Sequence, residues 1–264
     1  MKIPFTKMHG AGNDFMVVDD RERTFPSADK AFIQRIAARR TGIGCDGVLL
    51  IQPSASADMR MRFINPDGGE QAMCGNGARC VARLAFEIGY APAEMMIETG
   101  AGLVHAEVLG KQVRLKLTAP KDLKLDMQIG LDWNVDFVDT GVPHAVVWVD
   151  DVSGVNVMRC GRAIRQHKRF APAGTNANFA IVEPDGSLTM RTYERGVEAE
   201  TLACGTGAAA VAVLAAEHGW IKLPVTVHCA GGHDLVIDTD QGEITLMGDA
   251  ETVFDGEVDY GDRV

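Results

Sequence analysis

The sequence has 264 residues, and several features that it lacks exclude classes of protein. Its longest uncharged run, residues 201–216, is too short and too rich in glycine to span a membrane. Positive charge is in deficit, because 26 lysines and arginines stand against 36 aspartates and glutamates, for a net charge of −10. This balance argues against nucleic acid or acidic membranes as partners. Residues 1–14 carry charges and no apolar core, so we expect no signal peptide and a cytoplasmic location.

Cysteine pairs at the spacings of metal or redox chemistry are also missing. The six cysteines form no CxxC pair and show no Cys/His spacing suited to zinc. Disulfides are rare in a reducing cytoplasm, so we expect free thiols and no metal. A glycine pattern at residues 42–47 formally matches a dinucleotide fingerprint. It follows a predicted helix and precedes a strand, which is the reverse of the order that this fingerprint needs, so we interpret it as a loop.

Two of the cysteines lie in related stretches of sequence. Residues 70–90 and 200–220 align without a gap and are identical at eleven of twenty-one positions, which indicates an internal duplication. In both stretches apolar residues recur at helical spacing after the cysteine. The pattern therefore predicts that Cys74 and Cys204 each lie at the N-terminus of a helix.

Short strands separated by turns surround these two helices in the sequence. Residues 3–20 read as a strand, a glycine loop and a second strand, and further strands are predicted through both halves up to 250–254. Shorter helices are predicted at 30–40, closed by Gly42, and at 161–170. With many strands and one buried helix per half, we predict an α+β fold. It has two pseudo-twofold-related domains, each a mainly antiparallel, barrel-like layer of strands around a central helix.

A pair of thiols at helix N-termini points to acid/base chemistry. The helix dipole and the free backbone N–H groups lower the pKa of a thiol and bind a carboxylate. Inverting a stereocentre needs one group to remove a proton from one face and another to return a proton to the opposite face. A single free cysteine is commonly a small buried hydrophobe, but a matched pair at duplicated helix starts favours function. We therefore hypothesise that Cys74 and Cys204 face each other across a site. The other cysteines are interpreted as structural: Cys45, Cys80, Cys160 and Cys229.

Several polar residues are candidates for the same site, each with a simpler alternative. His144 follows a tight turn and Glu194 ends the strand that leads to Cys204, so both could exchange protons with the sulfurs. His144 could equally be a surface residue. Arg195 could clamp a carboxylate or be a plain surface charge. Asn13 could hold a polar group of a ligand or serve as a turn residue that tolerates positive φ.

The motifs together resemble the diaminopimelate epimerase family, pyridoxal-independent enzymes of bacterial lysine biosynthesis. The resemblance extends from residue 7 to the second cysteine helix, and the matching stretches are 7–15, 65–68, 73–77, 141–144, 174–176, 193–196 and 203–207. It departs from some members at Gly47, where they have Gln, and at Val142, where they have Asn.

The resemblance implies interconversion of LL- and meso-2,6-diaminopimelate by Cys74 and Cys204, assisted by His144 and Glu194, without cofactor or metal. It implies a homodimer whose subunits have two domains, residues 1–118 plus 252–264 and residues 119–251. It further implies a set of substrate-binding residues: Asn13, Asn65, Gly75, Asn76, Asn176, Glu194, Arg195, Gly205 and Thr206.

Three other functions fit the paired cysteines. A proline-racemase-like enzyme would use the same logic on another substrate, although Asn65, Asn176 and Arg195 favour a long charged one. A thiol redox protein would join the two cysteines in a catalytic disulfide, which the lack of CxxC disfavours. A non-catalytic amino-acid-binding protein would keep its affinity when the cysteines are replaced.

Overall fold

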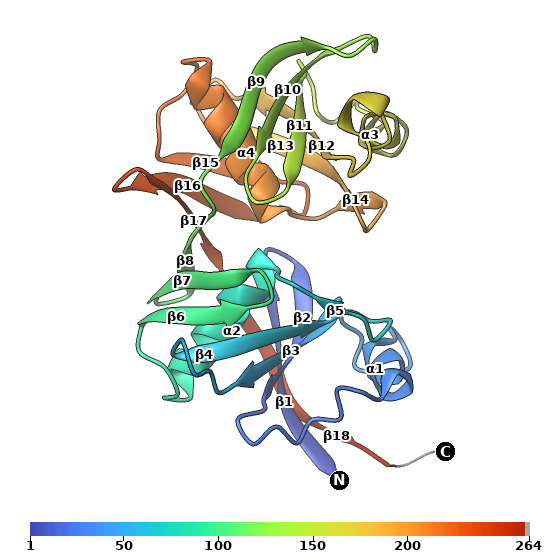
Figure 1. Ribbon diagram of the computed structural model, residues 1–264, viewed down its shortest axis with the longest axis vertical. Coiled ribbons are helices and arrows are strands. Elements are labelled where there is room, and N and C mark those ends of the chain that lie inside the picture. The colour runs from blue at the N-terminus through green and yellow to red at the C-terminus, as the bar shows by residue number, and fades with distance from the viewer. Residues whose placement is uncertain (262–264) are drawn as a thin grey trace. The chain divides into compact units, whose positions relative to one another are not determined.

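The computed structural model describes residues 1–261 and consists of two compact units (Figure 1). The first contains residues 1–115 together with the C-terminal segment from Gly248, and the second contains residues 116–247. The crossing predicted at residues 118–120 lies just after the first boundary. Among the described residues, no helix has both the length and the apolar character to cross a bilayer.

Unit 1 contains a layer of strands in which the first strand of the chain pairs with the last. Its strands pair in the order β18, β1, β2, β3, β4, β6, β7 and β8, and β5 adds to β4. Only the β2–β3 and β4–β6 steps among these are parallel. Its elements are β1 (Lys2–Gly10), β2 (Asn13–Asp19), α1 (Lys30–Ala37), β3 (Gly47–Gln52), β4 (Met59–Ile64), β5 (Glu70–Gln71), α2 (Gly75–Glu87), β6 (Glu94–Thr99), β7 (Gly102–Leu109), β8 (Gln112–Lys116) and β18 (Glu251–Asp259).

Unit 2 repeats this scheme. Its strands pair in the order β9, β10, β11, β12, β13, β15 and β16, β14 adds to β13, and the parallel steps are β11–β12 and β13–β15. Its elements are β9 (Lys121–Gln128), β10 (Asn134–Asp139), β11 (Pro143–Trp148), α3 (Val157–Arg165), the 3₁₀ helix η1 (Lys168–Phe170), β12 (Asn176–Val182), β13 (Leu188–Glu194), β14 (Ala199–Thr201), α4 (Gly205–Glu217), β15 (Val225–Cys229), β16 (Asp234–Asp240) and β17 (Glu243–Asp249).

The two units have corresponding registers in the parallel strand pair that precedes each cysteine, β2–β3 in unit 1 and β11–β12 in unit 2. Phe15 lies opposite Gly47 in unit 1, and His144 lies opposite Asn176 in unit 2. Phe15 therefore occupies the place of His144. The prediction of a duplicated α+β fold is confirmed.

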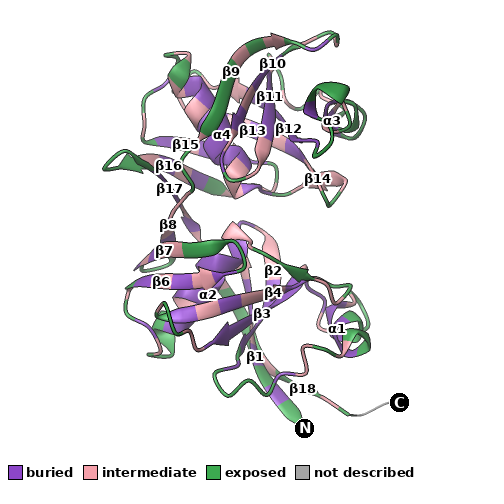
Figure 2. Cartoon of the chain, in the orientation of Figure 1, coloured by how far each residue is buried: buried purple, intermediate pink, exposed green. Residues whose placement is uncertain are grey.

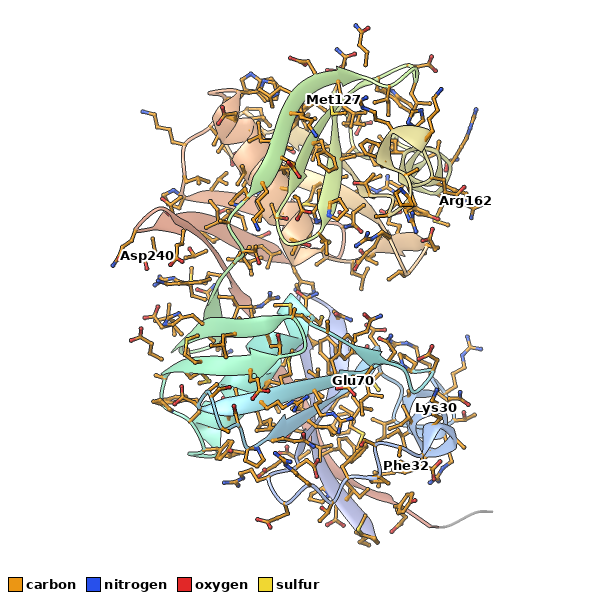
Figure 3. The ribbon with its side chains drawn as sticks, in the orientation of Figure 1. Lys30, Phe32, Glu70, Met127, Arg162 and Asp240 are labelled. Atoms are coloured by element: carbon orange, nitrogen blue, oxygen red, sulfur yellow. The ribbon has the colours of Figure 1, made fainter. Side chains whose placement is uncertain are left out.

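Each cysteine helix is the core of its unit. Helix α2 packs against β1, β2, β3, β4, β6 and β7, and α4 packs against β10, β11, β12, β13, β15 and β16. The buried parts of both helices and of the surrounding strands stand out in Figure 2. Helices α1 and α3 lie outside this arrangement, and their charged residues Lys30 and Arg162 are exposed and project outward (Figure 3).

Several predicted boundaries were wrong. Helix α1 ends at Ala37, and Gly42 is not its C′ residue. A side chain at Gly42 would come within 2.2 Å of the Arg35 carbonyl, so the glycine is needed for close approach to the helix end. Helix α3 begins earlier than predicted, because the Asn156 side chain accepts a hydrogen bond from the Arg159 N–H. The charged strand β9 and the short strands β5 and β14 were missed.

Two glycines allow each cysteine helix to lie close to the strand beneath it. A Cβ added at Gly77 would lie 3.1 Å from Leu49 on β3, and one added at Gly207 would lie 2.7 Å from Asn178 Oδ1 on β12. Leu49 and Asn178 are both fully buried, so neither side chain can move into solvent to make room for a methyl group. Glycine at these positions therefore sets the depth at which the first helical turn sits.

We predict that Gly207→Ala lowers the free energy of unfolding by about 1–3 kcal/mol, because the added methyl group overpacks a filled site. Gly75→Ala is the matched control, since a Cβ at Gly75 would meet nothing within 4 Å. Chemical denaturation followed by circular dichroism measures both. Equal stability of the two variants would contradict the proposed packing constraint.

Candidate functional site

Both predicted cysteines are the N-cap residues of their helices. Cys74 and Cys204 have extended backbone conformations, and the helices begin at Gly75 and Gly205. Neither cysteine side chain makes a capping hydrogen bond. Donors of the first turn, including those of Gly75 and Gly205, are therefore available to an anionic group of a ligand.

The surroundings of Cys74 are built from two amides. Cys74 Sγ donates to Asn13 Oδ1 at 3.6 Å, and Asn76 Nδ2 approaches the same oxygen at 3.4 Å. The Asn13 Nδ2 group donates to Asp46 at 2.6 Å, and Arg79 donates to Asn76 Oδ1 at 2.9 Å. Because Asp46 only accepts and Arg79 only donates, they fix the orientation of both amides. Asn13 therefore presents an acceptor to the sulfur.

A charged cluster holds Asp46 in place. Arg39 donates to Asp46 at 2.7 Å and to Asp14 at 2.6 Å, and Lys7 pairs with Asp14 at 2.5 Å. Burial alone would raise the pKa of Asp14, but the hydrogen bonds from Arg39 and Lys7 lower it below its usual range. Asp14 is therefore ionised at neutral pH, and its ion pairs with Lys7 and Arg39 anchor the loop before β3.

Cys204 lies in a more enclosed environment than Cys74. Its side chain is buried, and its Sγ is 3.6 Å from Thr206 Oγ1. Burial raises the pKa of Cys204, and the nearby Glu194 raises it further, whereas the Thr206 hydroxyl lowers it. Burial also raises the pKa of Glu194. Two acids with raised pKa values thus lie close together, which is an arrangement suited to exchanging a proton.

His144 is fully buried and joins this group through Thr206. Its Nε2 is 3.0 Å from Thr206 Oγ1, and its Nδ1 is 3.1 Å from Asn178 Nδ2. Burial and the neighbouring Arg195 lower the pKa of His144 to about 3. The imidazole is therefore neutral at physiological pH. It is not a surface histidine.

Asn176 connects the two turns that carry His144 and Glu194. Its Nδ2 donates to the Pro143 carbonyl at 3.1 Å, and its Oδ1 accepts from the Arg195 N–H at 2.8 Å. The Arg195 side chain is half-buried and donates to the Ala173 carbonyl. Asn176 thus holds the loops in position, whatever else it contacts.

In unit 1, Asn65 begins the turn after β4, in which Gly68 N–H donates to the Asn65 carbonyl. The predicted residues consequently form two groups, each assembled within its own unit. Unit 1 holds Asn13, Asn65, Cys74, Gly75 and Asn76, and unit 2 holds His144, Asn176, Glu194, Arg195, Cys204, Gly205 and Thr206.

The remaining cysteines are free thiols. Burial raises the pKa of Cys80 to about 12 and also raises that of Cys45. Within residues 1–261 no group of three or more His, Cys, Asp or Glu side chains is arranged to hold a metal ion.

Three residues next to the predicted ones were missed from the sequence: Asp46, Arg79 and Asn178. Asp46 and Arg79 orient the amides at Cys74, and Asn178 contacts His144. A usable signal existed for Asn178, because a polar residue that follows Asn176 in a mostly apolar strand must find a partner when buried. Asp46 lies in a glycine loop, where nothing in the local pattern identifies its contacts.

Comparisons with known proteins agree with the duplicated architecture. The model of the family described as "Diaminopimelate epimerase" matches residues 5–121 and again residues 137–253. The chain is 42% identical over 277 residues to the diaminopimelate epimerase of Aquifex aeolicus, covering 97% of this chain and 98% of the relative. It is 41% identical over 273 residues to that of Archaeoglobus fulgidus, covering 97% and 96%.

Solved structures show the same fold at lower identity. A phenazine biosynthesis protein of the PhzF family from Bacillus anthracis superposes with a TM-score of 0.74 at 18% identity, covering 98% of this chain and all of that one. A probable proline racemase from Agrobacterium radiobacter K84 gives 0.72 at 19% identity, covering 97% and 93%. These likenesses establish the fold alone. Because the family model matches both halves and the relatives align over nearly their full length, the chain belongs to the diaminopimelate epimerase family.

Proposed function

We propose that this chain is an isomerase that interconverts LL- and meso-2,6-diaminopimelate, with Cys74 and Cys204 as its two proton-transfer groups. The observation that carries this assignment is the placement of the two cysteines. Each is the N-cap residue of the central helix in one of two copies of the same fold. Family membership supports the substrate, and the duplicated thiols support the reaction.

The reaction follows from the chemistry of two thiols. One cysteine acts as thiolate and removes the proton from the α-carbon, so a C–H bond breaks and an S–H bond forms. The other acts as thiol and gives its proton to the opposite face, so its S–H bond breaks as the new C–H bond forms. The pair exchanges roles when the reaction runs in reverse. No redox change occurs in either direction.

The helix N-termini stabilise the charge that develops during this transfer. The substrate carboxylate gains negative charge as the α-carbon loses its proton. Backbone N–H groups that start at Gly75 and Gly205 are aligned before the reaction, so they need no reorganisation when the charge appears. Glycine directly after each cysteine leaves the approach to these donors free of a side chain.

Glu194 is the group that takes the thiol proton of Cys204. Burial raises the pKa of both acids, and the nearby Glu194 makes ionisation of Cys204 less favourable. The Thr206 hydroxyl favours the state in which the sulfur carries the charge.

The substrate carries charge at both ends, and the polar residues of the two groups provide contacts for it. In this proposal Asn13, Asn65 and Asn76 act from unit 1, and Asn176 and Arg195 act from unit 2. Arg195 is the natural partner of a carboxylate, because its planar guanidinium can donate two parallel hydrogen bonds. The reaction uses neither cofactor nor metal, and the enzyme works as a cytoplasmic homodimer.

The most direct test replaces each cysteine. We expect Cys74→Ala and Cys204→Ala each to reduce epimerisation by orders of magnitude, because each removes one of two obligatory proton-transfer groups. Exchange of the α-hydrogen with deuterated solvent measures the loss. Cys160→Ala, which alters a half-buried thiol on α3, is the control and should leave the rate unchanged. Wild-type turnover by Cys74→Ala would contradict the two-base mechanism.

The same exchange assay distinguishes the substrate. Deuterium should enter diaminopimelate at the α-carbon and should not enter proline. Incorporation into proline alone would instead assign the chain to a proline-racemase-like activity. Incorporation into neither substrate, with binding intact, would favour an amino-acid-binding protein.

A second prediction concerns Thr206. Removing its hydroxyl in Thr206→Val should raise the pKa of Cys204, because the hydrogen bond that lowers this pKa is lost. The pH dependence of kcat should therefore shift towards alkaline values, since a higher pH is needed to form the thiolate. Thr206→Ser keeps the hydroxyl and should retain the wild-type profile. Identical profiles for Val and Ser would exclude a role of the hydroxyl in ionising Cys204.

The assembly can be tested independently of the chemistry. We expect light scattering coupled to size-exclusion chromatography to give twice the mass of one chain. A mass of one chain at assay concentration, in a sample that turns over, would contradict the homodimer.

A further inference from the structure

Asn178 is a fully buried polar residue in the strand beneath the Cys204 helix. Its Nδ2 lies 3.0 Å from the Ala145 carbonyl oxygen and 3.1 Å from His144 Nδ1. Its Oδ1 lies 2.9 Å from the Thr192 hydroxyl oxygen. Both ends of the amide are therefore in contact with defined partners, and the arrangement has chemical consequences for His144.

The Ala145 carbonyl determines which way the amide points. A carbonyl oxygen only accepts hydrogen bonds, so the side of the amide that faces it must be the NH₂ group. The opposite orientation would place two oxygens against each other at 3.0 Å with no hydrogen between them. The same NH₂ group has a second hydrogen, and this hydrogen faces His144 Nδ1.

The amide in turn determines which nitrogen of His144 carries the proton. Nδ1 faces a donor, so it must use its lone pair and accept. A neutral imidazole has one N–H group, which must then be on Nε2. Burial lowers the pKa of His144 to about 3, which keeps the ring neutral. Because Nε2 already carries the proton, the ring could accept a further proton only at Nδ1, which would break the Asn178 hydrogen bond and create a buried cation.

The direction of the hydrogen bonds continues to the sulfur. His144 Nε2–H donates to Thr206 Oγ1 at 3.0 Å. Because the Thr206 oxygen already accepts this bond, its own hydrogen is free to point to Cys204 Sγ at 3.6 Å. Three successive donors, Asn178, His144 and Thr206, are therefore aligned toward Cys204.

We propose that Asn178 is a positioning residue that holds His144 in the Nε2–H tautomer, so that His144 donates through Thr206 toward Cys204 and does not act as a base. The proposal deepens the proposed function and rests on it for the role of Cys204. It assigns the removal of the Cys204 proton to Glu194 rather than to His144.

Unit 1 has apolar residues in place of the first two donors of this relay. The residue equivalent to His144 is Phe15, and the residue equivalent to Asn178 is Leu49, because they hold the same register positions on their strands. Gly77 packs over Leu49 as Gly207 packs over Asn178. An apolar pair therefore satisfies the packing of this layer. The polar pair in unit 2 is not needed for the fold itself, which argues that its hydrogen bonds serve the sulfur.

The wild-type protein provides the first test. Nuclear magnetic resonance of the protein labelled with ¹⁵N in its seven histidines distinguishes protonated from unprotonated ring nitrogens. A His144→Gln variant assigns the signal. We expect Nε2 of His144 to be protonated and Nδ1 to be unprotonated throughout the neutral pH range. A protonated Nδ1 at neutral pH would overturn the proposal.

Two variants test the consequence. Asn178→Asp replaces the donor that faces Nδ1 by an acceptor, so Nδ1 should become protonated and kcat should fall by about tenfold or more, with KM changed less than about twofold. The matched control is Thr192→Val, which removes the other hydrogen bond of the same amide and leaves its NH₂ group in place. This control should keep the Nε2–H tautomer and lose less than about threefold in kcat.

Each outcome of these experiments tests one part of the proposal. An unchanged tautomer in folded Asn178→Asp, or a changed tautomer with wild-type kcat, would overturn the role of Asn178. If Asn178→Asp fails to fold, Asn178→Leu copies the apolar side chain that unit 1 has at Leu49. In Asn178→Leu the tautomer of His144 should no longer be fixed, and kcat should fall by about tenfold. A wild-type kcat for Asn178→Leu would overturn the proposal. A wild-type protein with the Nε2–H tautomer and no exchange into diaminopimelate would refute the proposed function and leave the tautomer assignment intact.

Discussion

The close approach of each cysteine helix to its neighbouring strand is the constraint on which the rest of the structure depends. At Gly77 and Gly207 the helix lies so near the strand that a methyl group would overlap Leu49 or Asn178. This depth places the cysteine one turn earlier, at the N-terminus of a helix whose middle turns are buried. A buried helix with one reactive end satisfies two requirements at once, because the apolar turns stabilise the unit while the N-terminus stays available for an anion.

The two units keep this scaffold and differ in the groups that face the sulfur. At Cys74 the hydrogen bonds run toward an acceptor, Asn13 Oδ1, whose orientation Asp46 fixes. At Cys204 the sulfur faces the Thr206 hydroxyl, which donates to it in the proposed relay. Duplication explains the shared geometry, and substitutions at a few register positions explain the opposite polarity. An acceptor favours a thiol, whereas a donor favours a thiolate.

Most of the fold and the two cysteines could be predicted because their signals are local. Helical spacing after Cys74 and Cys204 and the identities between residues 70–90 and 200–220 need no knowledge of distant contacts. Strand β9 was missed because its residues are charged and mostly exposed, so pairing with β10 rather than burial makes it a strand. The contacts of Asn178 could not be predicted, since they depend on the register between β11, β12 and β13.

Burial explains why the Cys204 sulfur needs polar groups around it. A thiolate in an apolar interior is costly, and burial accordingly raises the pKa of Cys204. A positive neighbour would offset this cost but would also bind the substrate carboxylate and hold the sulfur permanently ionised. Neutral donors avoid both effects, because a hydroxyl can donate to a thiolate and accept from a thiol as the charge changes. A neutral histidine behind that hydroxyl adds polarity without adding charge, and this requires the tautomer that Asn178 imposes.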